Sequence, residues 1–292
     1  MPLSQAVVAS LCAVTPRPFE LLRAIPVGGG DINRSFLLEC VDGARYFLKL
    51  NTAPQHALFV AEAGGLAALA ATRTLRVPQV IAHGVAGDQS YLLLEYLALH
   101  SRGDARLLGA QLAALHRCTA DRFGFAQDNF IGSTAQPNAW RDDWVTFWRD
   151  QRLGFQLRLA AQKGYGGTLQ SAGKKLLQRL PAFFADYTPQ PSLLHGDLWG
   201  GNHAFLADGT PVIFDPAAYY GDRECDLAMT ELFGGYASDF YVAYRAEYPL
   251  DAGYAVRRDL YNLYHILNHA NLFGGGYVRQ SVQVIAKLLA SA

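Results

Sequence analysis

The segment His195–Asn202, HGDLWGGN, constrains the fold of this chain more than any other part of its sequence. It places Asp197 and Asn202 five residues apart, with Trp199 between them and three glycines around them. A core strand would not tolerate this combination, and an ordinary surface loop does not need it. We therefore expect a rigid loop that holds the Asp197 carboxylate and the Asn202 amide at a fixed distance from each other.

The first hundred residues have the character of strands around one helix. Phe36–Cys40 and Tyr46–Leu50 are short β-like runs, and residues 41–44, Val-Asp-Gly-Ala, are a hairpin signal between them. Residues 54–71 are rich in Ala and Leu and open with a proline, which predicts a helix. Tyr91–Leu97 is apolar apart from one glutamate, as expected of a buried strand.

Beyond about residue 100 the chain becomes mainly helical. A strand pair, 203–206 and 212–214, surrounds Asp208-Gly209. The predicted helices are 104–119, 140–161, 169–186, 224–233, 237–247, 254–272 and 277–291. The fold class is therefore α+β with two lobes, a small β-rich lobe over residues 1–97 and a larger helical lobe over 98–292.

The composition limits the classes of partner that this protein is expected to bind. Lys+Arg and Asp+Glu balance at 25 each, so no basic excess points to nucleic acid or to an anionic membrane surface. Any phosphate must be held by a few placed groups. The four cysteines are scattered, no basic residue precedes the apolar run Ala6–Val14, and no apolar run reaches the length of a membrane span. We expect a cytoplasmic protein; its oligomeric state has no signal in the sequence.

Further chemistry-bearing residues precede the HGDLWGGN segment. Residues 27–33, Val-Gly-Gly-Gly-Asp-Ile-Asn, could bring backbone N–H groups close to a phosphate, or could be a simple surface turn. Lys49 lies in an otherwise hydrophobic strand, and Glu62 follows thirteen residues later on the predicted helix. A strand lysine paired with a helix glutamate orients nucleotide phosphates in protein kinases, although Glu62 could equally face solvent.

The spacing of Asp197 and Asn202 matches the H-x-D-x-x-x-x-N pattern of the kinase catalytic loop. In that pattern the Asp accepts the proton of the attacking hydroxyl and the Asn carbonyl oxygen binds Mg²⁺. Asp215 ends the apolar run 212–214, where a second Mg²⁺ ligand is expected, although Asp-Pro could be only a turn. For His195 and Asp226 we favour structural roles, in which they support the loop backbone.

Taken with PVIFDPAAYYGDRECDLAMTELFGGY at residues 211–236, HGDLWGGN resembles the fructosamine (ketosamine) kinase family. This family is a branch of the aminoglycoside phosphotransferases with the protein-kinase-like fold. VGGGDINRSF resembles its nucleotide loop, NAWRDDWVTFW an internal helix and YNLYHILNHANLFG a C-terminal helix, so the resemblance covers nearly the whole chain. Trp199 and the Asp-Pro-Ala at 215–217 separate this family from choline and aminoglycoside kinases.

The resemblance implies an ATP-dependent kinase that phosphorylates the third-carbon hydroxyl of a ketoamine, after which the adduct decomposes and frees the amine. The substrate would be a small ketoamine or a glycated protein lysine, and the resemblance favours the shorter sugars. It also implies a role for each matching residue, as follows: Asp197 as base; Asn202 and Asp215 as Mg²⁺ ligands; Lys49, oriented by Glu62, on the ATP phosphates; Gly28, Gly29, Gly30, Asp31, Ile32 and Asn33 as the nucleotide loop; Glu95, Tyr96 and Leu97 at the adenine; and Trp199 lining the sugar site.

One residue departs from the glycine pattern of the protein-kinase loop, and two alternative functions stay open. Asn33 occupies the place of the third glycine of the protein-kinase loop, so phosphate contact would rely on the backbone of residues 30–33. The same fold could instead phosphorylate an aminoglycoside, a choline-like alcohol or a free sugar. A binding protein that kept the fold without catalysis is the third possibility, although no polar catalytic position is missing.

Overall fold

The computed structural model describes residues 3–15, 19–28 and 32–291, which form two compact units. The first unit contains Met1–Asp104 and also Ala204–Asp215, and the second contains Ala105–His203 and Pro216–Ala292. The segment 204–215, which we expected in the C-terminal lobe, thus groups with the N-terminal residues. The lobe boundary at residue 97 stays a prediction.

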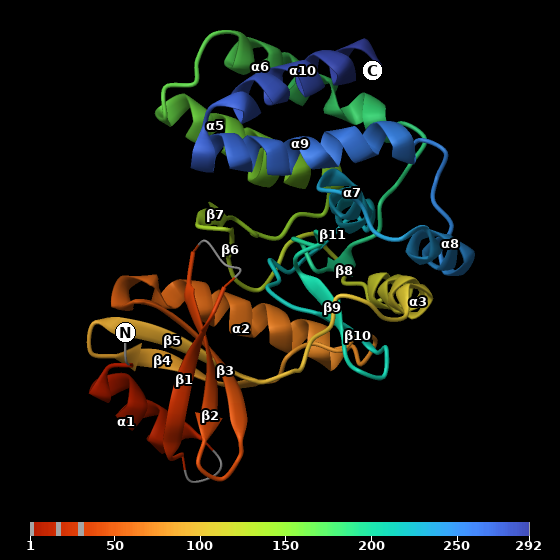
Figure 1. Cartoon of the computed structure of the whole chain (residues 1–292). Coiled ribbons are helices and arrows are strands. Elements are labelled where there is room, and N and C mark those ends of the chain that lie inside the picture. The colour runs from red at the N-terminus through yellow and green to blue at the C-terminus, as the bar shows by residue number, and fades with distance from the viewer. Residues whose placement is uncertain (1–2, 16–18, 29–31, 292) are drawn as a thin grey trace. The chain divides into compact units, whose positions relative to one another are not determined.

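A five-stranded antiparallel sheet is the centre of the first unit (Figure 1). Its strand order is β1-β2-β3-β5-β4. The strands are β1 (Leu21–Val27), β2 (Arg34–Cys40), β3 (Arg45–Thr52), β4 (Val80–Ala86) and β5 (Gln89–Glu95). The expected hairpin between β2 and β3 is confirmed: Gly43 has a φ of 82°, and the Asp42 carboxylate accepts the N–H of Ala44 at 3.0 Å.

The two faces of the sheet carry different helices. Leu48 and Leu50 of β3 belong to a buried cluster with Val7 and Leu11 of helix α1 (Gln5–Val14). Because side chains alternate along a strand, Lys49 points to the other face, which α2 (His56–Ala71) covers. Helix α2 follows the short 3₁₀ helix η1 (Ala53–Gln55), so the predicted helix 54–71 is confirmed.

Three elements of this unit depart from our expectation of strands around one helix. The apolar run Ala6–Val14 forms α1, which begins at a side-chain cap: Ser4 Oγ accepts the N–H of Val7. Strands β1 and β4 are the two edges of the sheet and are only partly buried. Pro26 lies in β1, which is compatible with an edge because an edge strand leaves half of its N–H groups unpaired.

The segment 204–215 is tied to the first unit by its own hairpin and by backbone bonds. Strands β9 (His203–Phe205) and β10 (Pro211–Ile213) pair with each other, as predicted around Asp208-Gly209. The N–H of Ile213 donates to the carbonyl of Arg76 at 3.0 Å, and the N–H of Phe205 to that of His100 at 2.9 Å. Asp215 thereby lies two residues after a strand that is bonded to the rest of the first unit.

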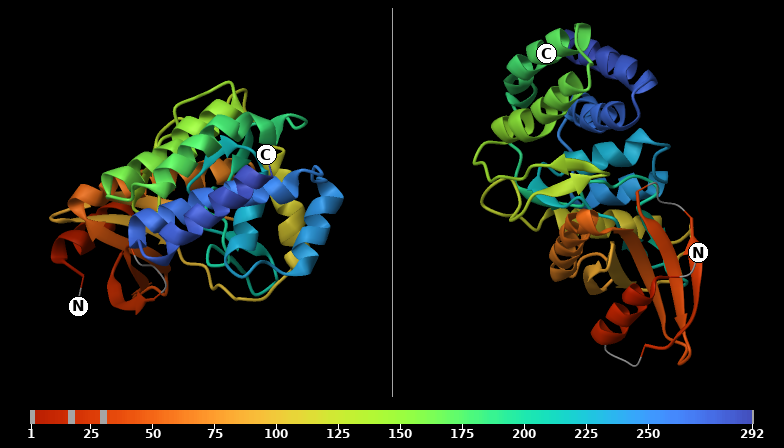
Figure 2. Two further views of the ribbon diagram at one scale, coloured as in Figure 1. Left: turned by 90° about the horizontal axis from the view of Figure 1, so that it is seen from above. Right: turned by 90° about the vertical axis from the view of Figure 1, so that its left-hand side faces the viewer.

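The second unit is mainly helical, as predicted, and its helices lie close to the expected ranges. They are α3 (Ala105–His116), α4 (Trp144–Phe147), η2 (Trp148–Leu153), α5 (Gly154–Gln162), α6 (Thr168–Arg179), η3 (Leu180–Phe184), α7 (Glu224–Leu232), α8 (Ser238–Glu247), α9 (Tyr254–Phe273) and α10 (Gly276–Ala290). The predicted helix 140–161 begins later, at Trp144, and contains a π-helical stretch, η2. Figures 1 and 2 show α9 and α10 side by side, with α6 against α10.

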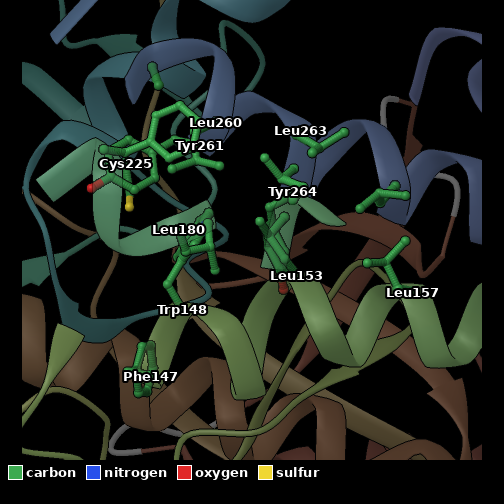
Figure 3. Packing of buried hydrophobic residues seen from close by; sticks show 14 of the residues in the cluster. Phe147, Trp148, Leu153, Leu157, Leu180, Cys225, Leu260, Tyr261, Leu263 and Tyr264 are labelled. Carbon is green, nitrogen blue, oxygen red and sulfur yellow. The ribbon is translucent and has the colours of Figure 1, made fainter. Parts of the chain in front are cut away.

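Aromatic packing forms the core of this unit (Figure 3). Trp148 of η2 meets Tyr261 of α9 edge-on at 4.9 Å between ring centroids, and both side chains are buried. Two small strand pairs complete the unit: β6 (Asn129–Ile131) with β7 (Thr134–Gln136), and β8 (Ser192–Leu194) with β11 (Tyr219–Gly221). In the part of the chain that the structure describes, no helix is both long and apolar enough to cross a membrane.

Candidate active site

The loop 195–202 follows directly on the buried strand β8 and is fixed by its own backbone. Gly196 adopts a φ of 82°, and a Cβ at this position would lie 2.2 Å from the carbonyl oxygen of Ala217. The N–H of Ala217 in turn donates to the carbonyl of His195 at 2.9 Å. Only glycine combines this φ with so close a backbone approach, which explains the His-Gly-Asp order.

A buried carboxylate anchors the start of the loop. Asp226 of α7 accepts the N–H of His195 at 2.7 Å and that of Gly196 at 2.8 Å. His116 of α3 donates to the same carboxylate at 3.2 Å, and Tyr244 lies 2.8 Å from the other ring nitrogen. Burial alone would raise the pKa of Asp226, but the His116 hydrogen bond and the neighbouring donors lower it. Asp226 is the loop anchor that we favoured, and His195 has the expected structural role, since its Nδ1 accepts the N–H of Asp197 at 3.2 Å.

Asp197 and Asn202 lie together, as the rigid-loop prediction required. Asn202 Nδ2 donates to the Asp197 carbonyl at 2.9 Å and to its carboxylate Oδ2 at 3.2 Å. Within the described residues no hydrogen bond to Oδ1 of Asn202 is present. A neutral amide oxygen left in this way fits Mg²⁺, which prefers hard oxygen ligands.

Trp199 lies at the surface of the same loop. Its side chain is 39% exposed, and its carbonyl accepts the N–H of Asn202 at 3.0 Å and the hydroxyl of Tyr236 at 3.2 Å. A Cβ on Gly201 would lie 2.3 Å from the indole, so the ring depends on glycine at that position. The loop therefore presents a fixed aromatic side chain next to Asp197; its role at the sugar stays a prediction.

Lys49, Glu62 and Asp215 form an ionic cluster in the first unit. Lys49 Nζ lies 2.7 Å from Glu62 Oε1 and 2.5 Å from Asp215 Oδ1, and its side chain is 7% exposed. Glu62 thus points to Lys49 and not to solvent. Burial alone would lower the pKa of Lys49, but the charges of Asp215 and Glu62 outweigh it and the pKa is raised. Burial and the Asp215 charge raise the pKa of Glu62 despite its bond to Lys49.

Asp215 differs from its two partners in exposure and in backbone. Its side chain is 45% exposed, so the carboxylate can take a further cation. Its φ of 59° is in the left-handed region, and it precedes Pro216, which restricts its conformation further. Such a conformation costs about 1–3 kcal/mol and persists only where the surroundings hold it. A carboxylate oxygen, like the amide oxygen of Asn202, is of the ligand type that Mg²⁺ prefers; the metal role of each residue stays a prediction.

The nucleotide loop is described in part. Gly29, Gly30 and Asp31 lie outside the described residues. Asn51 of β3 donates to the carbonyl of Ile32 at 3.2 Å and to the side-chain oxygen of Asn33 at 2.8 Å. A Cβ on Gly28 would meet open space. Asn51 therefore fixes the end of this loop, a role that the sequence analysis missed because Asn51 lies in no recognisable motif.

The segment expected at the adenine follows β5. The Glu95 carboxylate is occupied by Arg76 at 2.5 Å and by the N–H of Gln79 at 2.5 Å, so its side chain is structural. For Tyr96 and Leu97, no backbone hydrogen bond is present within the described part of the chain. Both residues are partly buried, and their contact with the adenine stays a prediction.

The model of the family described as fructosamine kinase matches residues 3–291 of this chain. The chain is 47% identical over 290 residues to a probable ketoamine kinase of Synechocystis, covering 98% of this chain and 96% of the relative.

The chain belongs to the fructosamine kinase family.

Other comparisons agree. The chain is 43% identical over 263 residues to the chloroplastic protein-ribulosamine 3-kinase of Arabidopsis thaliana, covering 89% of this chain and 80% of that relative. A crystal structure from Haemophilus somnus described as a fructosamine-3-kinase superposes with a TM-score of 0.88 at 30% identity, covering 98% of this chain and 97% of the other. An ADP-bound aminoglycoside phosphotransferase shares the fold alone, with a TM-score of 0.65 at 13% identity, covering 98% and 99% of the two chains. The predictions of fructosamine kinase family, kinase-like fold and phosphotransferase activity are confirmed.

Proposed function

We propose that this member of the fructosamine kinase family transfers a phosphoryl group from ATP to the third-carbon hydroxyl of a ketoamine, a step in deglycation. The observation that carries the proposal is the match over 98% of the chain to a probable ketoamine kinase. Support for the third-carbon position comes from the relative named protein-ribulosamine 3-kinase. Support for ATP comes from the ADP-bound neighbour of the same fold.

In this proposal Asp197 is the general base. Its carboxylate is held by Asn202, so it can accept the hydroxyl proton without first being oriented. Trp199 offers its indole to the sugar. The substrate is a ketoamine on a small amine or on a protein lysine.

Nucleotide binding falls to the residues of the first unit. Lys49, with its raised pKa, stays charged and pairs with phosphate oxygens, while Glu62 keeps the ammonium in place. The backbone of Tyr96 and Leu97 meets the adenine, and residues 28–33 meet the phosphates.

Asn202 and Asp215 are the proposed Mg²⁺ ligands. When bound, Mg²⁺ neutralises charge on the transferring phosphoryl group.

A cytoplasmic location is part of the proposal. The cysteines Cys12, Cys40, Cys118 and Cys225 are all free thiols, which is typical of a reducing compartment.

The test is a kinase assay that follows ADP release with a panel of acceptors. Ribulosamines, erythrulosamines and fructosamines are compared, each as a small amine adduct and on a glycated protein lysine. An aminoglycoside, choline and free ribulose serve as alternative acceptors. We expect turnover with ketoamines, no turnover in Asp197→Ala, and retained nucleotide binding in that variant. Preferred turnover of an aminoglycoside, choline or free sugar would show that the ketoamine assignment is wrong.

A further inference from the structure

Five buried side chains are linked by hydrogen bonds into one network, which we call the amide chain. It reaches the backbone that follows Asp215. Its members are Arg152, Asn138, Asn129, Gln136 and Tyr264, all in the second unit. None of them belongs to the motifs that identify the catalytic loop or the nucleotide site. All are buried, with exposed fractions between 0% for Arg152 and 4% for Asn129.

Arg152 begins the chain and sets its direction. Its guanidinium donates to the carbonyl of Pro137 at 2.6 Å and to Asn138 Oδ1 at 2.7 Å, and it stacks over the Tyr219 ring at 4.0 Å. Among the described residues, it forms no salt bridge. Burying a charged group without a carboxylate is costly, so this guanidinium relies on the carbonyl and amide oxygens that it binds, and its bonds fix the orientation of Asn138.

Donors and acceptors along the chain can take only one order. Because a guanidinium has no acceptor, Asn138 must turn its oxygen to Arg152. Asn138 Nδ2 then donates to Asn129 Oδ1 at 3.0 Å, and Asn129 Nδ2 donates to the carbonyl of Ala218 at 2.8 Å. Both amides are thereby fixed against a flip, and the Ala218 carbonyl receives its bond in one geometry.

A second arm ends on the neighbouring carbonyl. Gln136 Nε2 donates to the carbonyl of Ala217 at 3.1 Å and to Asn129 Oδ1 at 2.7 Å. Tyr264 donates its hydroxyl to Gln136 Oε1 at 2.7 Å, which leaves the amide nitrogen facing Ala217. Two consecutive carbonyls, at residues 217 and 218, are therefore held by side-chain amides.

These carbonyls lie next to the strained residue of the nucleotide site. Asp215 keeps a φ of 59° before a proline, and its carboxylate contacts Lys49. After Asp215 the polypeptide continues through the buried Pro216 to Ala217. The carbonyl of Ala217 accepts a hydrogen bond from Gln136. A backbone conformation of this kind needs support on both sides, and the amide chain supplies it on the C-terminal side.

We propose that this amide chain, with Gln136 at its centre, is a positioning device that keeps Asp215 in the left-handed conformation its metal-binding role requires. Gln136 does not touch substrate; it acts through the backbone of residues 216–218. The proposal rests on the metal role of Asp215 in the proposed function. It predicts that loosening the amide chain weakens the binding of Mg²⁺–nucleotide more than it weakens the fold.

The experiment compares Gln136→Met with the matched control Gln151→Met in the full-length protein. Gln151 is also buried and donates its Nε2 to one backbone carbonyl, that of Ala139, at 2.9 Å, but it does not contact residues 216–218. The primary measurement is binding of a fluorescent ATP analogue as Mg²⁺ is titrated. For Gln136→Met we expect the Mg²⁺ concentration at half-saturation to rise about tenfold, with metal-free nucleotide affinity unchanged and the control like the wild type. Turnover of a ketoamine should fall with an unchanged KM for that acceptor.

Equal Mg²⁺ dependence in Gln136→Met, Gln151→Met and the wild type would overturn the proposal, as would an equal loss in both variants. If Gln136→Met does not fold, Tyr264→Phe removes one hydrogen bond and keeps the ring, and we expect a shift of about two- to threefold in the same direction. No shift in a folded Tyr264→Phe then contradicts the proposal.

Nucleotide binding needs no acceptor substrate. The experiment can therefore distinguish a wrong ketoamine assignment from a wrong role of the amide chain. If the wild type binds nucleotide in a Mg²⁺-dependent way but phosphorylates no ketoamine, the substrate assignment is wrong and the comparison of the two glutamine variants still decides the amide chain. A wild type that shows no Mg²⁺-dependent nucleotide binding would overturn the metal role of Asp215 and this proposal together.

Discussion

The two groups of candidate catalytic residues are held in place by different physics. Lys49, Glu62 and Asp215 in the first unit orient one another through opposite charges at 2.5–2.7 Å. The loop that carries Asp197 and Asn202 in the second unit is held by hydrogen bonds that its backbone makes, above all those that the N–H groups of His195 and Gly196 donate to the buried Asp226.

Because of this difference, the proposed function and the stability of the site should be separable in the loop but not in the ionic cluster. In the ionic cluster Lys49 and Asp215 support each other and are also the proposed phosphate contact and metal ligand, so a substitution at either should change nucleotide binding directly. In the loop the support is a residue that does not touch substrate. The side chains of Asp197 and Asn202 can therefore be altered without removing the anchor, and the anchor can be altered without removing them.

The largest effect should come from Asp197→Asn. An asparagine can still accept the hydrogen bond of Asn202, so the loop keeps its geometry and loses only the base. We expect kcat to fall by about 10²–10⁴-fold with little change in ATP affinity. Steady-state kinetics and a nucleotide titration measure the two quantities. A comparable loss of ATP affinity would break the distinction between the two groups.

Lys49→Met should have the next largest effect, of the opposite kind. Without the ammonium, Glu62 and Asp215 are two nearby carboxylates with no cation between them. We expect kcat/KM for ATP to fall by about 10²-fold, and Mg²⁺–nucleotide affinity to fall with it. Glu62→Gln, which keeps a hydrogen-bond acceptor, is the milder matched variant. Unchanged nucleotide affinity in Lys49→Met would contradict the role given to this cluster.

Asp226→Asn should act on stability as well as on turnover. The amide has one acceptor oxygen where the carboxylate accepts the N–H groups of His195 and Gly196 and the His116 ring, so buried donors lose partners. We expect the free energy of unfolding to fall by about 2–4 kcal/mol and kcat to fall by about tenfold. Chemical denaturation and kinetics on the folded fraction test this. An active variant of wild-type stability would show that the loop does not depend on the anchor.

His265 should give the smallest effect, a change in how stability depends on pH. Burial, with a smaller effect of the neighbouring His269, lowers the pKa of His265 to about 3. Between that value and the ordinary histidine pKa of about 6.5, the unfolded chain binds a proton that the folded protein does not. Stability contributed by this group is therefore lost as pH falls below about 6.5. Relative to His265→Phe, the wild type should lose up to about 1.4 kcal/mol per pH unit in this window. The free energy of unfolding of both proteins is measured by denaturation at several pH values. An equal dependence on pH in the wild type and in His265→Phe would contradict the lowered pKa of His265.

Much of the local structure could be predicted because the signals are local. The turns Asp42-Gly43 and Asp208-Gly209 place a glycine with positive φ after an aspartate that accepts a nearby N–H, and both hairpins are present. The edge strands β1 and β4 were missed because an edge strand is only half buried and lacks a clean apolar pattern. Helix α1 was missed because its nine apolar and small residues, 6–14, indicate a helix only once the sheet they pack on is known.

Some residues of the candidate site could likewise be predicted from the sequence, and others could not. The spacing of Lys49 and Glu62, and that of Asp197 and Asn202, could be read because each pair lies on adjoining elements or in one loop. Asn51 and the amide chain from Arg152 to Ala218 have no such signal, since their side-chain partners lie between 7 and 128 residues away in sequence, at no fixed spacing, and their other partners are backbone carbonyls.

The order of glycine loop, strand lysine, helix glutamate, HGDLWGGN and strand aspartate was enough to indicate the family and a phosphotransferase, because each motif is short and carries its own polar groups. The structure confirms the anchoring carboxylate on α7, which the sequence had suggested, and it alone reveals the other supports, an asparagine on β3 and a buried arginine on η2. Several of these supports also bond backbone N–H or carbonyl groups, as Asp226 does at His195 and Asn51 at Ile32. Nearly every residue type presents such groups alike, so the sequence of the supported segment does not reveal which residue supports it.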